Sequence, residues 1–268
     1  MQILECKSIR GMMIDKLKAE IDRRLALAII QIGDFPENTV YLKTKKKLAL
    51  ELDIEIIEIK YYGNNCKNEI ISKILELNMD NRITGIMIQK PIIAGFDYQK
   101  LVDLIDPMKD VEGLNSKNQL KLINGDEAVI PCTVSAILKV FHEYEISLLN
   151  RKIVIIGKSN LIGRPLYHIL NRNNEVLLCD SKTLNLSSIT RSADIVIVAI
   201  GKPNYFDSNY FRCGQIVIDV GTNYVDDKLV GDVDFNSVKD LVSITPVPGG
   251  VGQLTPICLF ENLLDLSK

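Results

Sequence analysis

Apolar, β-branched segments alternate with amphipathic stretches along the whole chain. The first half predicts strands at 25–32, 54–59 and 83–89, with helices at about 39–52 and 67–79. The second half repeats the pattern, with strands expected at 152–156, 176–179, 195–200 and 215–219 and a helix at 163–172. This alternation is typical of an α/β fold in which helices cover both faces of parallel sheets.

A polar stretch at 115–126 separates the two halves and predicts a boundary region. We therefore expect two lobes, one formed by residues 1–117 and a Rossmann-like lobe formed by residues 118–252, which a helix at about 134–144 introduces. The last segment, 256–266, has helical spacing and could pack on either lobe.

Composition restricts the class of protein. With 47% hydrophobic residues in 268 the chain can bury a core, and its net charge of −2 gives no general attraction to nucleic acid or anionic membrane. No apolar run reaches the roughly 18 residues that span a bilayer, and no signal peptide is visible. Six scattered cysteines lack metal-ligand spacing, so we expect reduced thiols, a cytoplasmic protein and no metal site.

A glycine-containing turn follows the expected strand at 152–156. Gly157 permits a tight turn and Gly163 lets the next helix pack closely, so helix N-terminal amides would face a pyrophosphate. Ser159 replaces the middle glycine of the common G-x-G-x-x-G pattern, and an ordinary strand–helix connection is the alternative. Gly201 and Gly221 end two further strands and favour dinucleotide binding.

A lysine interrupts an apolar helix face in the first half. Tyr41, Lys45, Leu48, Ala49 and Leu52 share one face of the helix expected at 39–52, with Asn38 or Thr39 as its N-cap. Lys45 has two possible roles. Either it packs its aliphatic stem at the edge of this face and holds its ammonium group in solvent, or it is a desolvated amine of lowered pKa that suits proton transfer.

Three other features carry candidate chemistry. Gln89 ends an apolar strand and Asp110 lies in a loop, although the first could be a strand terminator and the second a turn residue. The segment Thr-Pro-Val-Pro-Gly-Gly-Val-Gly at 245–252 either brings backbone close to a ligand or simply reverses the chain.

Taken together, these motifs resemble the bifunctional methylenetetrahydrofolate dehydrogenase/cyclohydrolase family over essentially the whole chain. The resemblance rests on Tyr-Leu-Lys-Thr-Lys at 41–45, Gly-Ile-Met-Ile-Gln-Lys-Pro at 85–91, Asp-Pro-Met-Lys-Asp-Val-Glu-Gly at 106–113, Ile-Pro-Cys-Thr at 130–133, the turn at 157–165, Val-Ile-Asp-Val-Gly at 217–221 and the segment at 244–252.

The resemblance implies a homodimeric enzyme with a folate-binding catalytic domain at 1–117, onto which 253–268 packs back, and an NADP-binding domain at 118–252. It further implies oxidation of 5,10-methylenetetrahydrofolate to the methenyl form and hydrolysis to 10-formyltetrahydrofolate. In these roles Lys45 and Gln89 are catalytic, Tyr41 stacks along the folate and Asp110 holds the pterin. The resemblance also implies that the folate is bordered by Pro248, Gly249 and Gly250. It implies that the dinucleotide is bordered by Gly157, Lys158, Ser159, Ser181 and Thr222.

Departures from the family pattern concern both ligands. Glu112 replaces the usual second aspartate, Lys90 follows Gln89, and Asp180 stands where histidine is usual. Asp180 is placed as in enzymes that hold the ribose 2′-hydroxyl of NAD, so NAD is possible although NADP is favoured.

Several alternatives remain open on the sequence. One is a dehydrogenase without cyclohydrolase activity, possibly NAD-dependent, and another is an amino-acid or shikimate-type dehydrogenase, which would leave Lys45, Gln89 and Asp110 unexplained. A nucleotide-binding module without catalysis is the last, and the intact residue set argues against it.

Overall fold

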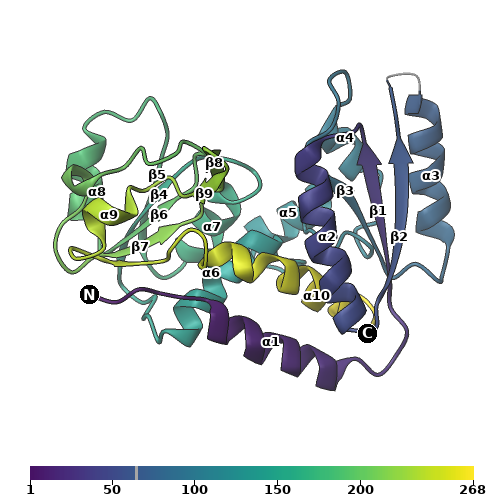
Figure 1. The fold of residues 1–268 in the computed structure, drawn as a ribbon, viewed down its shortest axis with the longest axis horizontal. Coiled ribbons are helices and arrows are strands. Elements are labelled where there is room, and N and C mark those ends of the chain that lie inside the picture. The colour runs from purple at the N-terminus through teal and green to yellow at the C-terminus, as the bar shows by residue number, and fades with distance from the viewer. Residues whose placement is uncertain (64–65) are drawn as a thin grey trace. The chain divides into compact units, whose positions relative to one another are not determined.

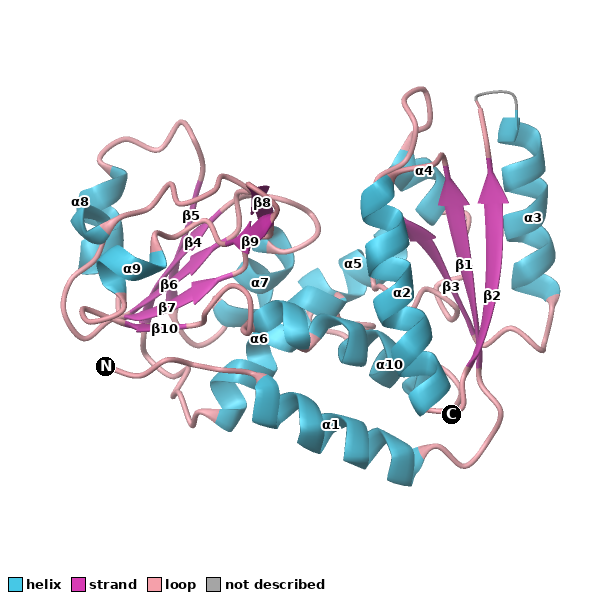
Figure 2. Ribbon diagram, in the orientation of Figure 1, coloured by secondary structure: helices cyan, strands magenta, loops and turns pink. Residues whose placement is uncertain are grey.

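The computed structural model describes residues 1–63 and 66–268 and has the α/β architecture predicted, with two parallel sheets (Figures 1 and 2). The chain divides into two compact units. Unit 1 comprises Met1–Met12 and Thr133–Thr255, and unit 2 comprises Met13–Cys132 and Pro256–Lys268. The division falls inside α1 (Lys7–Glu20) and close to the first residues of α6 (Cys132–Glu143) and α10 (Thr255–Asp265).

Unit 2 contains a three-stranded parallel sheet in the order β2-β1-β3. Its elements are β1 (Ala26–Ile32), α2 (Pro36–Glu51), β2 (Glu55–Tyr61), α3 (Lys67–Met79), β3 (Gly85–Gln89), α4 (Tyr98–Val102) and α5 (Ser116–Asn124). One face of the sheet, including Ile30 and Ile88, packs with Ile70 and Ile74 of α3 in a continuous apolar core. Because side chains alternate along a strand, Gln89 points to the opposite face.

Unit 1 is built on a five-stranded parallel sheet in the order β10-β7-β6-β4-β5. Its elements are β4 (Lys152–Ile156), α7 (Gly163–Leu170), β5 (Glu175–Cys179), α8 (Leu186–Ser192), β6 (Ile195–Val198), β7 (Ile216–Asp219), the hairpin β8 (Asn223–Val225) and β9 (Lys228–Val230), α9 (Phe235–Val238) and β10 (Ser243–Ile244), with 3₁₀ turns at Ser208–Tyr210 and Val251–Gln253. In chain order this is a 2-1-3-4-5 sheet, the doubly wound type whose ligands bind at the carboxyl ends of the strands, where the order reverses between β4 and β6.

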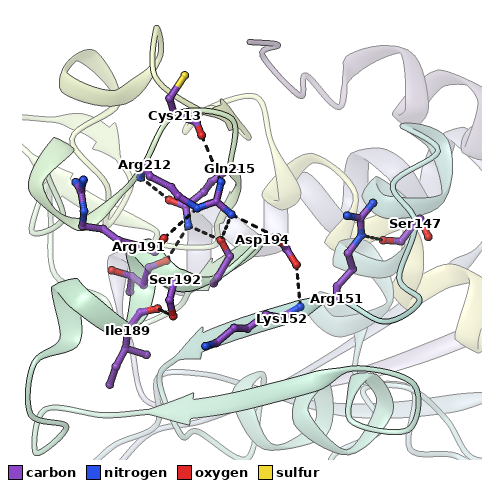
Figure 3. A network of polar contacts seen from close by, with 12 residues as sticks. Ser147, Arg151, Lys152, Ile189, Arg191, Ser192, Asp194, Arg212, Cys213 and Gln215 are labelled. Carbon is purple, nitrogen blue, oxygen red and sulfur yellow. Dashed lines mark hydrogen bonds and ion pairs between the residues drawn. The ribbon is translucent and has the colours of Figure 1, made fainter.

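A polar network holds the amino ends of the strands of this sheet (Figure 3). The Arg212 guanidinium donates to the Arg191 and Ala193 carbonyls at 3.0 Å, and Gln215 donates to the Ala193 carbonyl at 2.7 Å. Asp194 accepts from the Lys152 amide at 3.0 Å, which ties β6 to β4. Each of these groups bonds the protein's own backbone, so the network stabilises the edge opposite the expected ligand site.

The boundaries differ from the predicted ones at 117 and 252, because the polar stretch at 115–126 is helical and belongs to unit 2. Asn115 caps α5 by accepting from the Lys117 amide, and its own amide group donates to the Ile105 carbonyl at 2.9 Å. These bonds hold α5 in unit 2, which extends to Cys132. The C-terminal helix packs there too, since Asn262 donates to the Val111 and Ile130 carbonyls at 2.9 and 3.0 Å.

Candidate active site

Lys45 and Gln89 are in direct contact in unit 2. The Lys45 Nζ donates to the Gln89 Oε1 at 2.8 Å, and the Gln89 Nε2 donates to the Lys90 carbonyl at the same distance. Gln89 is the last residue of β3 and is 6% exposed, so its amide is held at the carboxyl edge of the sheet. The Lys45 ammonium group is therefore directed to the strand ends of the sheet by a fixed acceptor.

Glu112 and Tyr98 complete a polar cluster around this pair. The Tyr98 hydroxyl lies 3.5 Å from the Glu112 Oε2 and 3.4 Å from the Ile88 carbonyl oxygen. The Lys90 Nζ lies 3.9 Å from the centre of the Tyr98 ring, in the position of a cation–π contact. The Glu112 carboxyl group thus meets the Tyr98 hydroxyl, and the charges of Lys45 and Lys90 act on it.

Burial and charge act against each other in this cluster. Burial lowers the pKa of Lys45, which the negative charge of Glu112 opposes. Burial also raises the pKa of Glu112, to about 7, although the Lys45 charge opposes this shift. Burial thus favours the neutral form of both groups, and a neutral amine together with a carboxyl group that titrates near pH 7 suits proton transfer.

Asp110 has a different environment from Glu112. Its side chain is 1% exposed, and its Oδ2 accepts from the Asn115 amide at 2.8 Å and from the Asn118 Nδ2 at 3.0 Å. Burial raises the pKa of Asp110, opposed by these donors. The carboxylate expected to hold a pterin is thus occupied in fixing the start of α5, and the geometry favours Glu112 as the carboxyl group that meets a ligand.

The helix face that singled out Lys45 is present in α2. Leu48, Ala49 and Leu52 are at most 3% exposed, whereas Tyr41 is 39% exposed and its ring centre lies 5.9 Å from the Lys45 Nζ. The predicted N-cap at residue 38 or 39 is wrong: the helix begins at Pro36, because proline suits the first helical position. Asn38 lies inside the first turn, where its Nδ2 donates to the Pro91 carbonyl at 3.0 Å.

In unit 1, the turn after β4 leaves no room for a side chain at its two glycines. Gly157 has a φ of 119°, and a Cβ there would collide with the Ala199 carbonyl oxygen at the end of β6. A Cβ on Gly163 would collide with the Gly157 carbonyl oxygen, so the first turn of α7 lies directly on the loop. Ser159 accepts from the Ile162 amide at 3.2 Å and shapes that turn. The geometry fits a dinucleotide pyrophosphate at a helix N-terminus.

The other predicted dinucleotide contacts lie at the same strand ends. Lys158 follows Gly157, Ser181 follows β5 by two residues, and Thr222 lies between β7 and β8. All three side chains are exposed. They belong to loops at the carboxyl edge of one sheet.

Two buried carboxylates, which the sequence did not point to, hold the loops of this edge. Asp232 is fully buried and accepts from the amides of Ile200, Gly201 and Lys202 at 2.7, 3.0 and 2.8 Å. Asp219 accepts from the Gly221 and Asp232 amides at 2.9 and 3.0 Å. The loops after β6 and β7 are therefore fixed to one another by carboxylates.

The segment 246–250 also belongs to unit 1. Gly249 has a φ of 114°, and its carbonyl accepts from the Cys6 amide at 2.9 Å. A Cβ on Gly250 would come within 2.5 Å of the Pro246 carbonyl oxygen. Pro248, which precedes the two glycines, is exposed, and the glycines themselves place no side chain over the backbone of the loop.

A hollow of about 780 Å³ in unit 2 lies away from this chemistry, at the amino ends of β1 and β2. Its charged walls are paired with each other, as in the contacts Lys18–Glu51 and Arg24–Glu55. Over residues 1–63 and 66–268 we find no cluster of histidine, cysteine or acidic side chains that could bind a metal ion, and no helix long and apolar enough to cross a membrane.

One unit is doubly wound with a glycine turn, and the other carries a partly buried lysine–glutamine pair; a chain with both features belongs to an α/β dehydrogenase class. Comparison with known proteins makes this specific. Residues 4–112 match the catalytic domain of the tetrahydrofolate dehydrogenase/cyclohydrolase family, and residues 131–268 match its NAD(P)-binding domain. The chain belongs to this family.

Individual relatives match this chain over nearly the whole length of both proteins. The chain is 39% identical to the bifunctional protein FolD of Rickettsia massiliae, over 99% of this chain and 96% of the relative. It superimposes with a TM-score of 0.96 on the bifunctional methylenetetrahydrofolate dehydrogenase/cyclohydrolase of Campylobacter jejuni, at 36% identity over 100% and 98% of the two chains. The Trypanosoma brucei dehydrogenase-cyclohydrolase, solved with NADP and an inhibitor, gives 0.93 at 26% identity, over 98% and 96%.

These matches bear out the predicted family and the bifunctional folate enzyme over the alternatives. Both domains of the family are matched, which the shikimate-type interpretation does not explain. The chain is thus an oxidoreductase and hydrolase of folate one-carbon units.

Proposed function

We propose that this enzyme oxidises 5,10-methylenetetrahydrofolate with NADP and then hydrolyses the methenyl product to 10-formyltetrahydrofolate, with Lys45 as the proton-transfer group. The observation that carries this proposal is the 2.8 Å contact between the Lys45 Nζ and the Gln89 Oε1 in a partly buried cluster. Burial lowers the pKa of this lysine, which favours the neutral amine that a proton acceptor needs.

In the hydrolytic step a water molecule attacks the methenyl carbon of a cationic substrate. Lys45 accepts the proton that the attacking water loses and returns it to N5 as the carbon–N5 bond breaks. The remaining hydroxyl proton of the adduct leaves to solvent as the formyl C=O bond forms, so the reaction releases one proton. The formyl group remains on N10. A neutral amine is needed at the start, since an ammonium group would repel the cation, and burial of Lys45 favours the neutral form.

Gln89 positions the amine for this role. Its Oε1 accepts from Lys45, while its own Nε2 is anchored on the Lys90 carbonyl, so the amide cannot rotate without losing a bond. Tyr41, one turn before Lys45 and 39% exposed, offers a ring face on which a folate can stack.

Glu112 is our preferred acceptor for the aminopyrimidine edge of the folate. It lies beside Lys45 and Lys90, whereas Asp110 already bonds Asn115 and Asn118. Asp110 then supports the site by fixing the loop that carries Glu112. This assignment replaces Asp110 as the proposed pterin ligand.

We assign the dinucleotide to the carboxyl edge of the sheet in unit 1. Bound NADP supplies the hydride acceptor of the oxidation. Gly157 and Ser159 would lie against the pyrophosphate, Lys158 and Ser181 at the adenosine ribose and Thr222 along the loop after β7; Pro248, Gly249 and Gly250 would border the folate. The NADP in the Trypanosoma brucei relative supports the choice of cofactor.

The test follows the two reactions separately with the purified chain. NADPH formation from methylenetetrahydrofolate measures the oxidation, and loss of methenyltetrahydrofolate absorbance measures the hydrolysis. Both should be catalysed by one protein. Absence of NADPH formation would refute the oxidation, and an uncatalysed rate of hydrolysis would refute the cyclohydrolase assignment.

We also propose a cytoplasmic homodimer. All six cysteines are free and five of them are buried, which supports a reducing compartment. The family resemblance supports the dimer. Light scattering of the purified chain should give twice the mass of 30.1 kDa, and a monomer mass would contradict it.

A further inference from the structure

Lys158 and Asp180 form an ion pair at the ends of adjacent strands. The strands β4 and β5 are parallel, with Ile156 opposite Cys179, so the residues that follow them emerge side by side. The Lys158 Nζ lies 3.0 Å from the Asp180 Oδ2, and both side chains remain partly exposed.

The Asp180 carboxylate is held in place by more than this lysine. Its Oδ1 accepts from the Lys182 amide at 3.0 Å and from the Thr183 hydroxyl at 3.3 Å. The Thr183 Oγ1 in turn accepts from the Asp180 amide at 3.0 Å. The orientation of the carboxylate is therefore set by its own loop, with one oxygen directed at Lys158.

In doubly wound units the end of the second strand meets the adenosine ribose. An acidic side chain there accepts from the 2′-hydroxyl of NAD, and a cationic side chain nearby accommodates the 2′-phosphate of NADP. Here β5 is the second strand, and the Lys158–Asp180 ion pair contains both an acidic and a cationic side chain.

Resting on the dinucleotide use proposed above, we propose that the Lys158–Asp180 pair selects the 2′ substituent and makes the enzyme accept both NADP and NAD with little discrimination. NAD would bind with the pair intact, its 2′-hydroxyl donating to Asp180. NADP would bind only when Lys158 exchanges the carboxylate for the phosphate, which then lies near the charge of Asp180. The gain from the ammonium–phosphate contact is offset by the broken pair and by this repulsion.

The pair is suited to mutation because exposed ion pairs contribute little to folding. A matched control exists at the other end of the same two strands, where the Lys152 Nζ lies 3.7 Å from the Glu175 Oε1. Replacing Glu175 by glutamine removes a β4–β5 ion pair far from the ligand edge.

The experiment measures the dissociation constants of NAD and NADP by calorimetry for the wild type and for the variants Asp180→Asn, Lys158→Met and Glu175→Gln. We expect the two wild-type dissociation constants to agree within about tenfold. Asp180→Asn should shift the ratio of the two constants toward NADP by at least about tenfold, and Lys158→Met should raise the dissociation constant of NADP alone by a similar factor. Glu175→Gln should leave the ratio unchanged.

Two results would overturn the inference: wild-type dissociation constants for NAD and NADP that differ by more than about tenfold, or a ratio that Asp180→Asn leaves unchanged. Either would leave the proposed function standing, provided that methylenetetrahydrofolate still reduces NADP. Failure of the wild type to bind either dinucleotide would instead overturn the proposed function and the inference with it.

Discussion

The two candidate sites use different means to reach a ligand. In unit 2 the active groups are side chains whose charge states depend on one another: Lys45, Glu112 and Lys90. In unit 1 the turn at Gly157 and Gly163 works through backbone shape, with no space for a Cβ. Proton transfer needs groups that titrate near neutral pH, whereas holding a dinucleotide needs close approach and fixed amides.

The supporting carboxylates show the same contrast. Asp232 and Asp219 in unit 1 bond backbone amides and fix loops. Asp110 in unit 2 also fixes a loop, and thereby leaves Glu112 as the carboxyl group next to Lys45. Substitutions of the titrating groups in unit 2 should consequently change rates, KM values and pH profiles, whereas substitutions in the glycine turn of unit 1 should change dinucleotide binding and stability.

The largest effect is expected from Lys45→Met. Methionine keeps most of the apolar stem on the α2 face but removes the amine bonded to Gln89, so folding should persist. Cyclohydrolase turnover should fall by at least about a hundredfold, the scale of lost acid–base catalysis, and the dehydrogenase should lose less. Stopped-flow assays with methylene- and methenyltetrahydrofolate measure the two steps.

The exposed neighbour Lys47 provides the control, since Lys47→Met makes the same chemical change on the same helix. Its activities should match the wild type. Wild-type hydrolysis by Lys45→Met would show that Lys45 is only a lysine at the edge of the apolar face.

Much of the fold could be predicted from the sequence because the hydrophobic pattern is regular. The helix expected at 67–79 is α3, and the strand expected at 152–156 is β4. The α5 helix was missed because its capping residue Asn115 and its buried Asn118 are held by distant partners, such as the Ile105 carbonyl and Asp110, which a local pattern does not reveal.

Part of the candidate site could also be predicted from the sequence. Lys45 was recognisable because it interrupts an apolar helix face, and Gln89 because it ends an apolar strand. Glu112 appeared only as a departure from the family pattern, and its partners Lys45 and Tyr98 come from other elements. Asp232 gave no signal at all, since its role depends on loops brought together by the sheet.

A second prediction separates the two carboxylates of unit 2. Glu112→Gln removes the charged acceptor beside Lys45, and the KM for methylenetetrahydrofolate should rise by about tenfold to a hundredfold, the scale of a charge-assisted bond. Asp110→Asn should instead lower the free energy of unfolding by about 1–3 kcal/mol, because an amide keeps only one acceptor oxygen. Its NH2 group then faces either the donors of Asn115 and Asn118 or the backbone amides of Glu112 and Leu114.

Urea denaturation and steady-state kinetics on both variants decide between the two assignments. The assignment would be wrong if Asp110→Asn kept its stability but lost folate affinity, and Glu112→Gln kept its folate affinity. The pterin would then bind Asp110, as the family resemblance first implied.

A third prediction concerns backbone shape in unit 1. Gly163→Ala adds a Cβ that collides with the Gly157 carbonyl oxygen, so it should weaken dinucleotide binding and lower the free energy of unfolding by about 1–3 kcal/mol. Gly11→Ala is the control, because that position lies in the middle of α1 with open space around it. It should be stabilised by about 0.5–1 kcal/mol. Equal dinucleotide affinity in Gly163→Ala and the wild type would mean that the turn tolerates a side chain.

The smallest effect is a shift of a pH profile in unit 2. Burial raises the pKa of Glu112 from its ordinary 4.5 to about 7, so only above this pH is the carboxylate fully ionised. If it binds the folate, the KM of the wild type should fall as pH rises through about 7. The same shift should lower the stability of the wild type relative to Glu112→Gln between about pH 4.5 and 7, where the folded state keeps a proton that the unfolded state has lost.

Lys90 tunes this profile, because its positive charge lowers the pKa of Glu112. Lys90→Leu should therefore move the inflection to higher pH, by less than about one unit since the lysine is largely exposed. The measurement is the KM for methylenetetrahydrofolate between pH 5.5 and 8.5, a range that brackets the expected pKa of about 7, in the wild type, in Lys90→Leu and in Glu112→Gln, which should show no inflection. An inflection that persists in Glu112→Gln would belong to another group, and the coupling of charges that distinguishes unit 2 from unit 1 would lose its main support.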